Sequence, residues 1–316
     1  MDDITQIEKN IENWPQDWGD DLLIILYGDF LPPSEDVALP ALGIKINHEN
    51  KRDSKFFSAR CVLDVSIKVN EKSVSAVLDA LGRLNLFLGV WVLSGGCHAC
   101  SWWSYITHGP IGRGVGFCEL DIGSLNPVCD AIRKLPDPVR LKVNAALYWV
   151  RAPRNLSMNY QIYENDSLRV YSGYWNAFEC LVEAVNMIMP RPKLSPSEKQ
   201  EKIDAFIVKQ KTDHGQIETE DIVKCYLDIV NPGFRGKAVH ALTVCFHDST
   251  PYIENCFGKP ERDSLYQIRN DIDHGNIDAE NPQELLRVEH RFIQLYRIVR
   301  NTFDWISQSD LEQGCL

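Results

Sequence analysis

The sequence predicts an α+β fold: an N-terminal mixed α/β domain with a mostly antiparallel sheet over residues 1–138, followed by an all-α helical bundle over residues 139–316. Two observations lead to this prediction. Before residue 138, short apolar runs rich in β-branched residues alternate with turn residues, whereas after it apolar residues recur every three or four positions. A chain of 316 residues, 44% of them hydrophobic, is also long enough to form two domains.

Most apolar runs of the first half have the length and composition of strands. The segment Glu71–Leu84 differs, because Val74, Val77 and Leu81 share one face of a helix. The predicted strands are Leu22–Gly28, Ala41–Ile46, Ala59–Val69, Leu86–Leu93, Cys100–Gly109 and Gly114–Asp121, the last three joined by turns at "SGG" and "GPIGRG".

The second half is predicted to be a series of helices. The last one is the best defined, because Asn281 can cap it, Pro282 suits its first position and Glu284 completes a capping-box pattern. Its apolar residues then repeat at spacings of three and four up to Ile306, as in the seam of a helical bundle. The predicted helices are Arg140–Ala152, Leu168–Ile188, Glu198–Gln210, Thr219–Val230, Lys237–Phe246, Ser264–Gly275 and Pro282–Ile306.

Composition favours a cytoplasmic protein that does not enter a membrane. Residues 1–18 are acidic and polar, unlike a secretory signal, and no run approaches the roughly 18 uninterrupted apolar residues of a membrane-spanning helix. The ten cysteines are scattered from Cys61 to Cys315, so we expect reduced thiols, several of them buried. The formal charge of −11 disfavours broad binding to nucleic acid, but is compatible with a local basic pocket or with another kind of partner.

The segment "SLYQIRNDIDHG" gathers polar side chains at the end of a predicted helix. At about 100° per residue, Asn270 and His274 lie about 40° apart on the helix, and the long side chain of Arg269 can reach the same edge. An imidazole can transfer a proton near neutral pH, and a guanidinium can hold a phosphate through two hydrogen bonds. The alternative is structural: Arg269 and Asp273 have the spacing of a surface ion pair worth about 0.2–0.5 kcal/mol.

The same segment resembles a known family. "YQIRNDIDHG" is similar to the Arg-polar-x-x-x-His signature of HEPN domains, in particular the Apea-like group. "YWNAFECLVEAV" resembles an earlier helix of that group, and "AALYWVRAPRN" resembles the helix that often opens the domain. The resemblance covers roughly residues 141–303.

This resemblance implies an all-α HEPN-like bundle that forms a homodimer, with the two motifs facing one cleft. It also implies a metal-independent endoribonuclease, a hydrolase-like nuclease that leaves a 2′,3′-cyclic phosphate and a 5′-hydroxyl, often as a toxin or an antiviral defence effector. Carried over, Arg269 would bind the scissile phosphate of RNA, His274 would act as general acid/base, and Asn270 would orient one of them. Asp271 and Asp273 depart from this picture, since they would repel RNA phosphate.

Three weaker patterns lie in the first half. Cys97, Cys100 and His108 could contribute to a metal site, but no second Cys-x-x-Cys supports them, so buried or turn cysteines are the simpler interpretation. "GPIGRGVG" lacks the Lys-Ser/Thr of a P-loop and is predicted to be a hairpin turn. Four residues, Trp102, Trp103, Tyr105 and Arg113, could form a stacking platform for a base, or simply pack in the core. We expect no cofactor.

The leading hypothesis is therefore an RNA endonuclease whose first domain senses a trigger or binds a regulatory partner or ligand. A second hypothesis is a non-catalytic HEPN-like protein whose helical domain serves dimerisation, regulation, or partner or nucleotide binding. A third makes the first half a ligand-binding or enzymatic domain and the bundle only a dimeriser.

Overall fold

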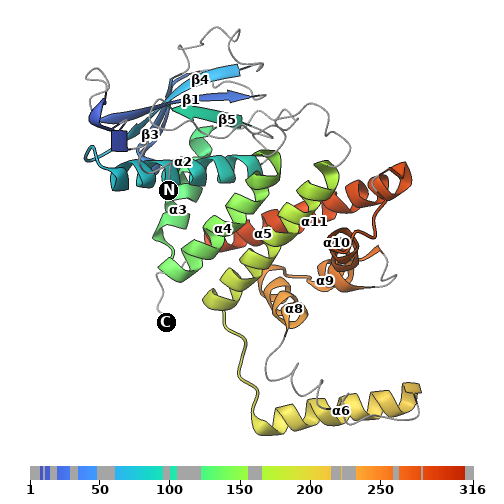
Figure 1. Cartoon of the computed structure of the whole chain (residues 1–316). Helices are drawn as coiled ribbons and strands as arrows, with labels where there is room; N and C mark the ends of the chain where they lie inside the picture. The colour runs from blue at the N-terminus through green and yellow to red at the C-terminus, as the bar shows by residue number, and fades with distance from the viewer. Residues whose placement is uncertain are drawn as a thin grey trace.

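The computed structural model describes residues 8–9, 11–14, 20–28, 35–47, 61–94, 100–104, 122–155, 166–214, 222, 233–258, 263–278 and 280–309. Within these ranges the fold is α+β, as predicted, with a sheet in the first half and helices through the second (Figure 1).

The described strands form one antiparallel sheet in the order β2-β3-β4-β1-β5. Its longest pairing joins β1 to β4, with Asp21 opposite Lys68 and Gly28 opposite Cys61. The predicted strands at Leu22–Gly28 and Ala59–Val69 are confirmed where they are described. The strands are β1 (Asp21–Gly28), β2 (Val37–Leu39), β3 (Ile44–Asn47), β4 (Cys61–Lys68) and β5 (Cys100–Ser104).

The strand predicted at Ala41–Ile46 begins three residues late. A 3₁₀ turn, η2 (Pro40–Leu42), precedes it and ends at Gly43, whose φ of 62° lies in the left-handed region that glycine adopts easily. The predicted strand at Gly114–Asp121 and the predicted turn "GPIGRG" lie outside the described residues.

The prediction of a strand at Leu86–Leu93 is wrong. One continuous helix, α2 (Val74–Leu93), spans both this run and the helix predicted before it. Every residue from Leu86 to Leu93 is buried, so the run shows no period that would distinguish a helix from a strand. Ser73 caps the helix by accepting a hydrogen bond from the backbone N–H of Ala76 at 3.2 Å.

Helix α2 is the one described helix that is long and apolar enough to cross a membrane by length and composition. However, 61% of its apolar window is buried inside the protein, because the helix lies between the sheet and α4 (Asp137–Asn155) (Figure 1). At Gly89 the approach is so close that a Cβ would lie 2.7 Å from Cβ of Leu147. These contacts are those of a core helix.

The helices predicted in the second half are confirmed where they are described, and Thr219–Val230 lies outside the described residues apart from Ile222. Two helices, α3 and α9, were not predicted. Helix α5 lies centrally and contacts α4, α8, α10 and α11, whereas α6 stands away from the bundle (Figure 1). Besides α2 and α4, the helices are α3 (Leu125–Lys134), α5 (Asp166–Ile188), α6 (Pro196–His214), α8 (Phe234–Cys245), α9 (Thr250–Phe257), α10 (Leu265–Asp273) and α11 (Pro282–Gln308).

One set of contacting buried side chains extends from the sheet through α2 and α4 to the last helix. Across it, the hydroxyl of Tyr296 in α11 donates a hydrogen bond of 3.1 Å to the carbonyl of Leu93 at the end of α2. The predicted domain boundary between residues 138 and 139 falls in the first turn of α4. A division of the chain into two domains there stays a prediction.

Candidate functional site

Helix α10, which carries the predicted motif, is well defined at both ends. Ser264 caps its start by accepting a hydrogen bond from the N–H of Gln267 at 3.2 Å. At its end Gly275 has a φ of 67°, in the left-handed region that a glycine adopts easily where a helix stops. The N–H of Gly275 donates to the carbonyl of Ile272 and that of Asn276 to the carbonyl of Asp271, at 3.1 and 2.7 Å. This pair of bonds is a Schellman motif, so the backbone itself ends the helix.

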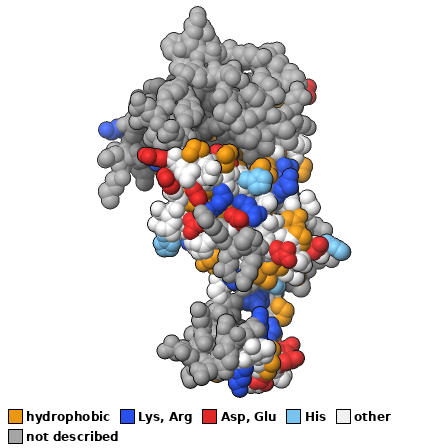
Figure 2. Space-filling model, turned by 90° about the vertical axis from the view of Figure 1, so that its right-hand side faces the viewer, with side chains coloured by type: hydrophobic (Ala, Val, Ile, Leu, Met, Phe, Trp, Pro, Cys, Tyr) orange, Lys and Arg blue, Asp and Glu red, His pale blue; other side chains and the backbone are white. Residues whose placement is uncertain are grey.

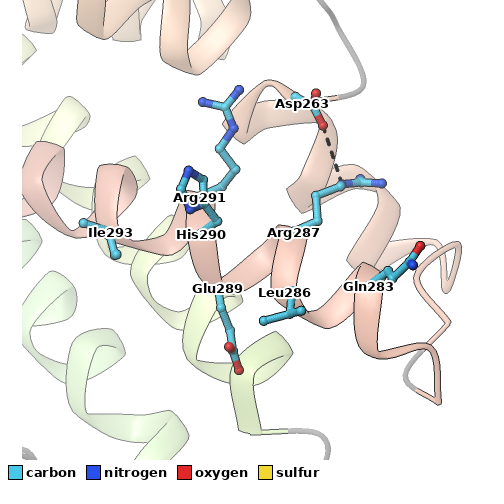
Figure 3. A pocket seen from close by; sticks show the side chains of 8 residues that line it. All are labelled: Asp263, Gln283, Leu286, Arg287, Glu289, His290, Arg291 and Ile293. Atoms are coloured by element: carbon cyan, nitrogen blue, oxygen red, sulfur yellow. Dashed lines mark ion pairs between the residues drawn. The ribbon is translucent and has the colours of Figure 1, made fainter.

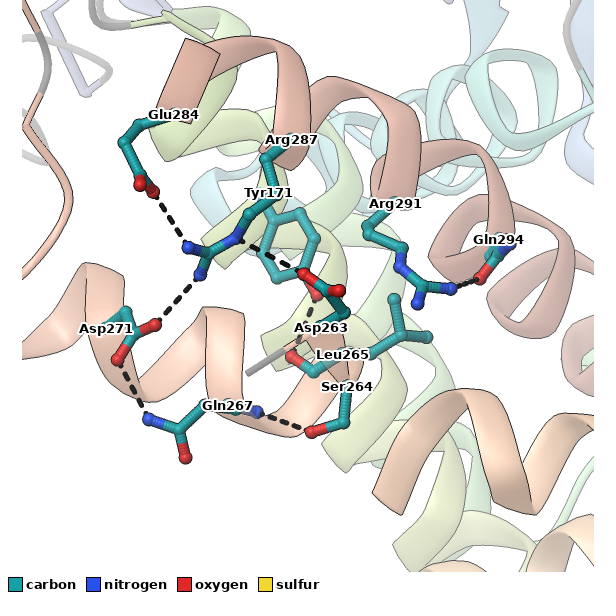
Figure 4. Close-up of polar contacts among 10 residues, drawn as sticks. All are labelled: Tyr171, Asp263, Ser264, Leu265, Gln267, Asp271, Glu284, Arg287, Arg291 and Gln294. Carbon is teal, nitrogen blue, oxygen red and sulfur yellow. Dashed lines mark hydrogen bonds and ion pairs between the residues drawn. The ribbon is translucent and has the colours of Figure 1, made fainter. Parts of the chain in front are cut away.

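Figure 4 shows two of the polar contacts that hold α10 against the rest of the bundle. The buried hydroxyl of Tyr171 in α5 donates a hydrogen bond of 2.8 Å to the carbonyl of Leu265, and burial raises the pKa of this tyrosine well above its usual value. Arg287 of α11 forms an ion pair of 2.9 Å with Asp271, which also accepts a hydrogen bond of 2.8 Å from Gln267. The charge of Asp271 is therefore compensated from α11.

Arg269 lies among acceptors. Its guanidinium forms ion pairs with Asp273 at 3.2 Å and with Glu179 of α5 at 3.8 Å, and donates a hydrogen bond of 3.2 Å to Oδ1 of Asn270. Glu179 in turn accepts a hydrogen bond of 2.7 Å from the indole of Trp175. The Arg269 side chain is 29% exposed, so solvent screens these ion pairs and a phosphate could still reach it.

His274 is exposed and follows the last residue of α10. Its backbone N–H donates a hydrogen bond of 3.0 Å to the carbonyl of Asn270, but its imidazole makes no hydrogen bond or ion pair with any described residue. The structure thus joins Arg269 to Asn270 directly and presents His274 to solvent at the same end of the helix. The surface ion pair considered from the sequence, Arg269 with Asp273, is present.

Sequence reasoning missed the polar face of α11 beside this motif. An open pocket of about 810 Å³ lies there, and Figure 3 shows Arg287 and Arg291 on the side of α11 nearer Asp263. Figure 2 shows basic, acidic and histidine side chains intermixed across this face of the molecule. The pocket is lined by Asp263, Gln283, Leu286, Arg287, Glu289, His290, Arg291 and Ile293. The only sequence signal was the polar positions between the apolar seam residues of α11.

The start of α11 is capped as predicted, but without the capping box. Asn281 Oδ1 accepts a hydrogen bond of 3.0 Å from the N–H of Gln283. Glu284 does not return a bond to Asn281, whose N–H donates to the carbonyl of Asp278. Glu284 instead forms an ion pair of 2.8 Å with Arg287, because the charged partner is a stronger attraction than a second backbone amide.

The weak metal candidates are not tested by this structure. Cys97 and His108 lie outside the described residues, and only the backbone of Cys100, at the start of β5, is described. Within the described part of the chain, no three His, Cys, Asp or Glu side chains come together as metal ligands.

The four cysteines whose side chains are described are unpaired, and Cys129 and Cys256 are buried, as expected for several of the thiols. Burial raises the pKa of Cys129 and of Cys245 to about 12, and raises that of Cys180 as well. These thiols stay protonated near neutral pH, so they are poor nucleophiles.

The fold and the site together define an α+β protein with a part-exposed arginine and amide on an anchored helix and an exposed histidine at its end. In comparisons with protein-family models, with curated proteins and with solved structures, no match to this chain was found.

Proposed function

We propose that this protein is a metal-independent endoribonuclease that acts as a homodimer in the cytoplasm. The observation that carries the proposal is the placement of the part-exposed Arg269 in the middle of α10 and of the exposed His274 just after its last residue, on a helix that Tyr171 and Arg287 hold in place. A rigid support of this kind favours catalysis, because side chains that are already in position do not have to be ordered at the moment of reaction.

In the proposed reaction the 2′-hydroxyl of RNA attacks the adjacent phosphorus, and the 5′-oxygen of the next nucleotide leaves. Arg269 binds the phosphate and offsets its developing charge, while His274 transfers the proton. Asn270 accepts a hydrogen bond from Arg269 at 3.2 Å, which suits it to orient the guanidinium. The products are a 2′,3′-cyclic phosphate and a 5′-hydroxyl, and DNA is spared because it has no 2′-hydroxyl.

The dimer completes the proposed site by bringing a second Arg269 and a second His274 to the same cleft. The biological role that follows is that of a toxin or antiviral defence effector. The sheet-containing half would sense the trigger or bind a regulatory partner or ligand, which would raise the rate of cleavage above a basal level.

The test is cleavage of mixed RNA by the purified full chain in EDTA. We expect cleavage by the unchanged protein, cyclic-phosphate ends on the products, and loss of cleavage in Arg269→Ala/His274→Ala. The matched control is Arg297→Ala/His247→Ala, which removes one exposed arginine and one exposed histidine elsewhere and should cleave normally. No cleavage by the unchanged protein, in a preparation that is dimeric by light scattering, would refute the nuclease.

A second candidate function is a non-catalytic HEPN-like interaction or regulatory protein. The ion pairs of Arg269 with Glu179 and Asp273 favour it, because a guanidinium already bound to two carboxylates can serve structure alone. The variant Asp273→Asn separates the two functions. If Arg269 binds phosphate, removal of the competing carboxylate should tighten RNA binding; if it is structural, the variant should only lower stability slightly.

A further inference from the structure

A second cavity lies between the segment that follows α5 and the beginning of α8, and its lining is basic. Its volume is about 570 Å³, in the range of small-molecule sites. None of the described residues that line it is acidic, although the chain as a whole carries a formal charge of −11. The lining residues are Arg191, Pro192, Leu194, Lys202, Gly233, Arg235, Gly236, Val239, His240 and Thr243.

The positive charges of this cavity come from three separate segments. Arg191 follows α5, Lys202 belongs to α6 and Arg235 lies in the first turn of α8. In the described part of the chain no ion pair joins Arg191 or Arg235 to a carboxylate, and Lys202 has only an electrostatic interaction with the exposed Glu198, one turn earlier on α6. Many other arginines of the bundle are paired. Arg235 stacks instead on the ring of Phe257, with 5.4 Å from guanidinium carbon to ring centroid, which leaves its charge uncompensated.

The beginning of α8 adds backbone donors to the same wall. Its first intrahelical hydrogen bond runs from the N–H of Lys237 to the carbonyl of Gly233, so the three preceding N–H groups have no carbonyl within the helix. No side chain caps this end, and a Cβ placed on Gly233 would meet no atom within 4 Å. Free N–H groups and the helix dipole attract an anion at such an end.

The wall between α5 and α8 is held in place by two hydrogen bonds. The side-chain amide of Asn186 donates to the carbonyl of Lys237 at 3.1 Å. Nε2 of His240 lies 2.9 Å from the carbonyl of Met189, and since a carbonyl can only accept, Nε2 carries the hydrogen. Arg235 and the beginning of α8 are thus presented by a connected surface, and Lys202 lines the cavity from α6.

We propose that this cavity binds a small phosphorylated ligand of the nucleoside polyphosphate class. The three cations and the beginning of α8 receive the phosphates, and Leu194 and Val239 offer apolar contact to the remainder of the ligand. The site is separate from the α10 motif, and the proposal does not depend on nuclease activity. The phosphates of RNA could bind to the same cations, so the experiment also titrates a short RNA separately.

The experiment is calorimetric titration of the full chain at low salt, without divalent metal, with ATP, inorganic triphosphate, adenosine and a short RNA. We expect ATP and triphosphate to bind and adenosine not to bind, with affinity falling as NaCl is added. In Lys202→Glu/Arg235→Glu the affinity should fall by roughly tenfold or more, because two attractive charges become repulsive. The control Lys209→Glu/Arg297→Glu changes the same net charge at exposed residues outside the cavity and should bind as the unchanged protein does.

Circular dichroism of each variant establishes that it folds, and the milder Lys202→Gln should lose part of the affinity. Failure of both ATP and triphosphate to bind, or equal affinity in the folded Lys202→Glu/Arg235→Glu variant, would overturn the proposal. Binding of RNA that depends on Lys202 and Arg235, without binding of ATP or triphosphate, would overturn the assignment to a small ligand. None of these results bears on cleavage, which the Arg269 and His274 variants report.

Discussion

Arg287 is expected to control the stability of α10. Its guanidinium lies 2.9 Å from Asp271 and 2.8 Å from Glu284, and Arg287 and Asp271 are 16% and 15% exposed. Arg287→Met keeps most of the apolar stem and removes the charge, which takes this cation away from three carboxylates, Asp263, Asp271 and Glu284. Breaking a fully buried pair costs about 3–5 kcal/mol, and partial screening by solvent reduces our expectation here to about 2 kcal/mol.

The assay is native-state hydrogen exchange of the α10 amides, which reports local opening. A loss of about 2 kcal/mol corresponds to roughly thirtyfold faster exchange. Arg287→Met/Asp271→Asn should recover part of the loss, because the most buried of the carboxylates that lose their cation is then neutral. The control is Arg300→Met, which lies on α11 like Arg287. The ion pair between Arg300 and Asp304 is 3.8 Å long and nearly half exposed, so this substitution should cost less than about 0.5 kcal/mol. Equal effects of Arg287→Met and Arg300→Met would refute the reasoning.

Three further changes test other parts of the fold. Gly275→Ala forces a residue with a Cβ into a φ of 67°, so we expect about 1 kcal/mol of lost stability in thermal unfolding and faster amide exchange in the last turn of α10. Gly89→Ala brings a Cβ to 2.7 Å from Leu147 and should cost about 1–3 kcal/mol in urea denaturation; an unchanged midpoint would show that α2 and α4 can separate freely. Burial raises the pKa of Cys129 and Cys245 from 9.0 to about 12, so the unfolded chain releases these protons first. The stabilisation from the two protonated thiols is complete below pH 9 and is lost as pH rises towards 12, when the free energy of unfolding falls by up to about 1.4 kcal/mol per thiol and pH unit. This fall should be shallower in Cys129→Ala/Cys245→Ala, which urea denaturation at several pH values measures.

The fold class followed from the sequence because strands and helices leave different periods. The strand β3 was found because its residues alternate between a buried and an exposed face, and the helix α11 because its apolar residues repeat at helical spacing. The prediction at Leu86–Leu93 was wrong for the opposite reason. Protein surrounds this part of α2 on all sides, so no polar residue marks the helical period.

The end of α10 could be predicted because its signal is local. Gly275 adopts the left-handed conformation expected from its position after the helix. The partners of the motif could not be predicted, because Glu179 lies on α5 and reaches Arg269 only through the packing of two helices. The basic cavity was equally hidden, since its cations come from segments that no sequence period relates.

The hydrogen bond between Tyr296 and Leu93 spans 203 residues, and α11 also contacts α3. During synthesis from the N-terminus, the sheet and α2 emerge long before the helix that completes the core around them. Contacts between such distant parts of a chain form slowly, because a long loop must close before they contribute. Helix α2 can pack against α3 and α4 soon after it is made, but its contact with α11 forms only after Tyr296 has been added, and until then the end of α2 around Leu93 lacks this partner.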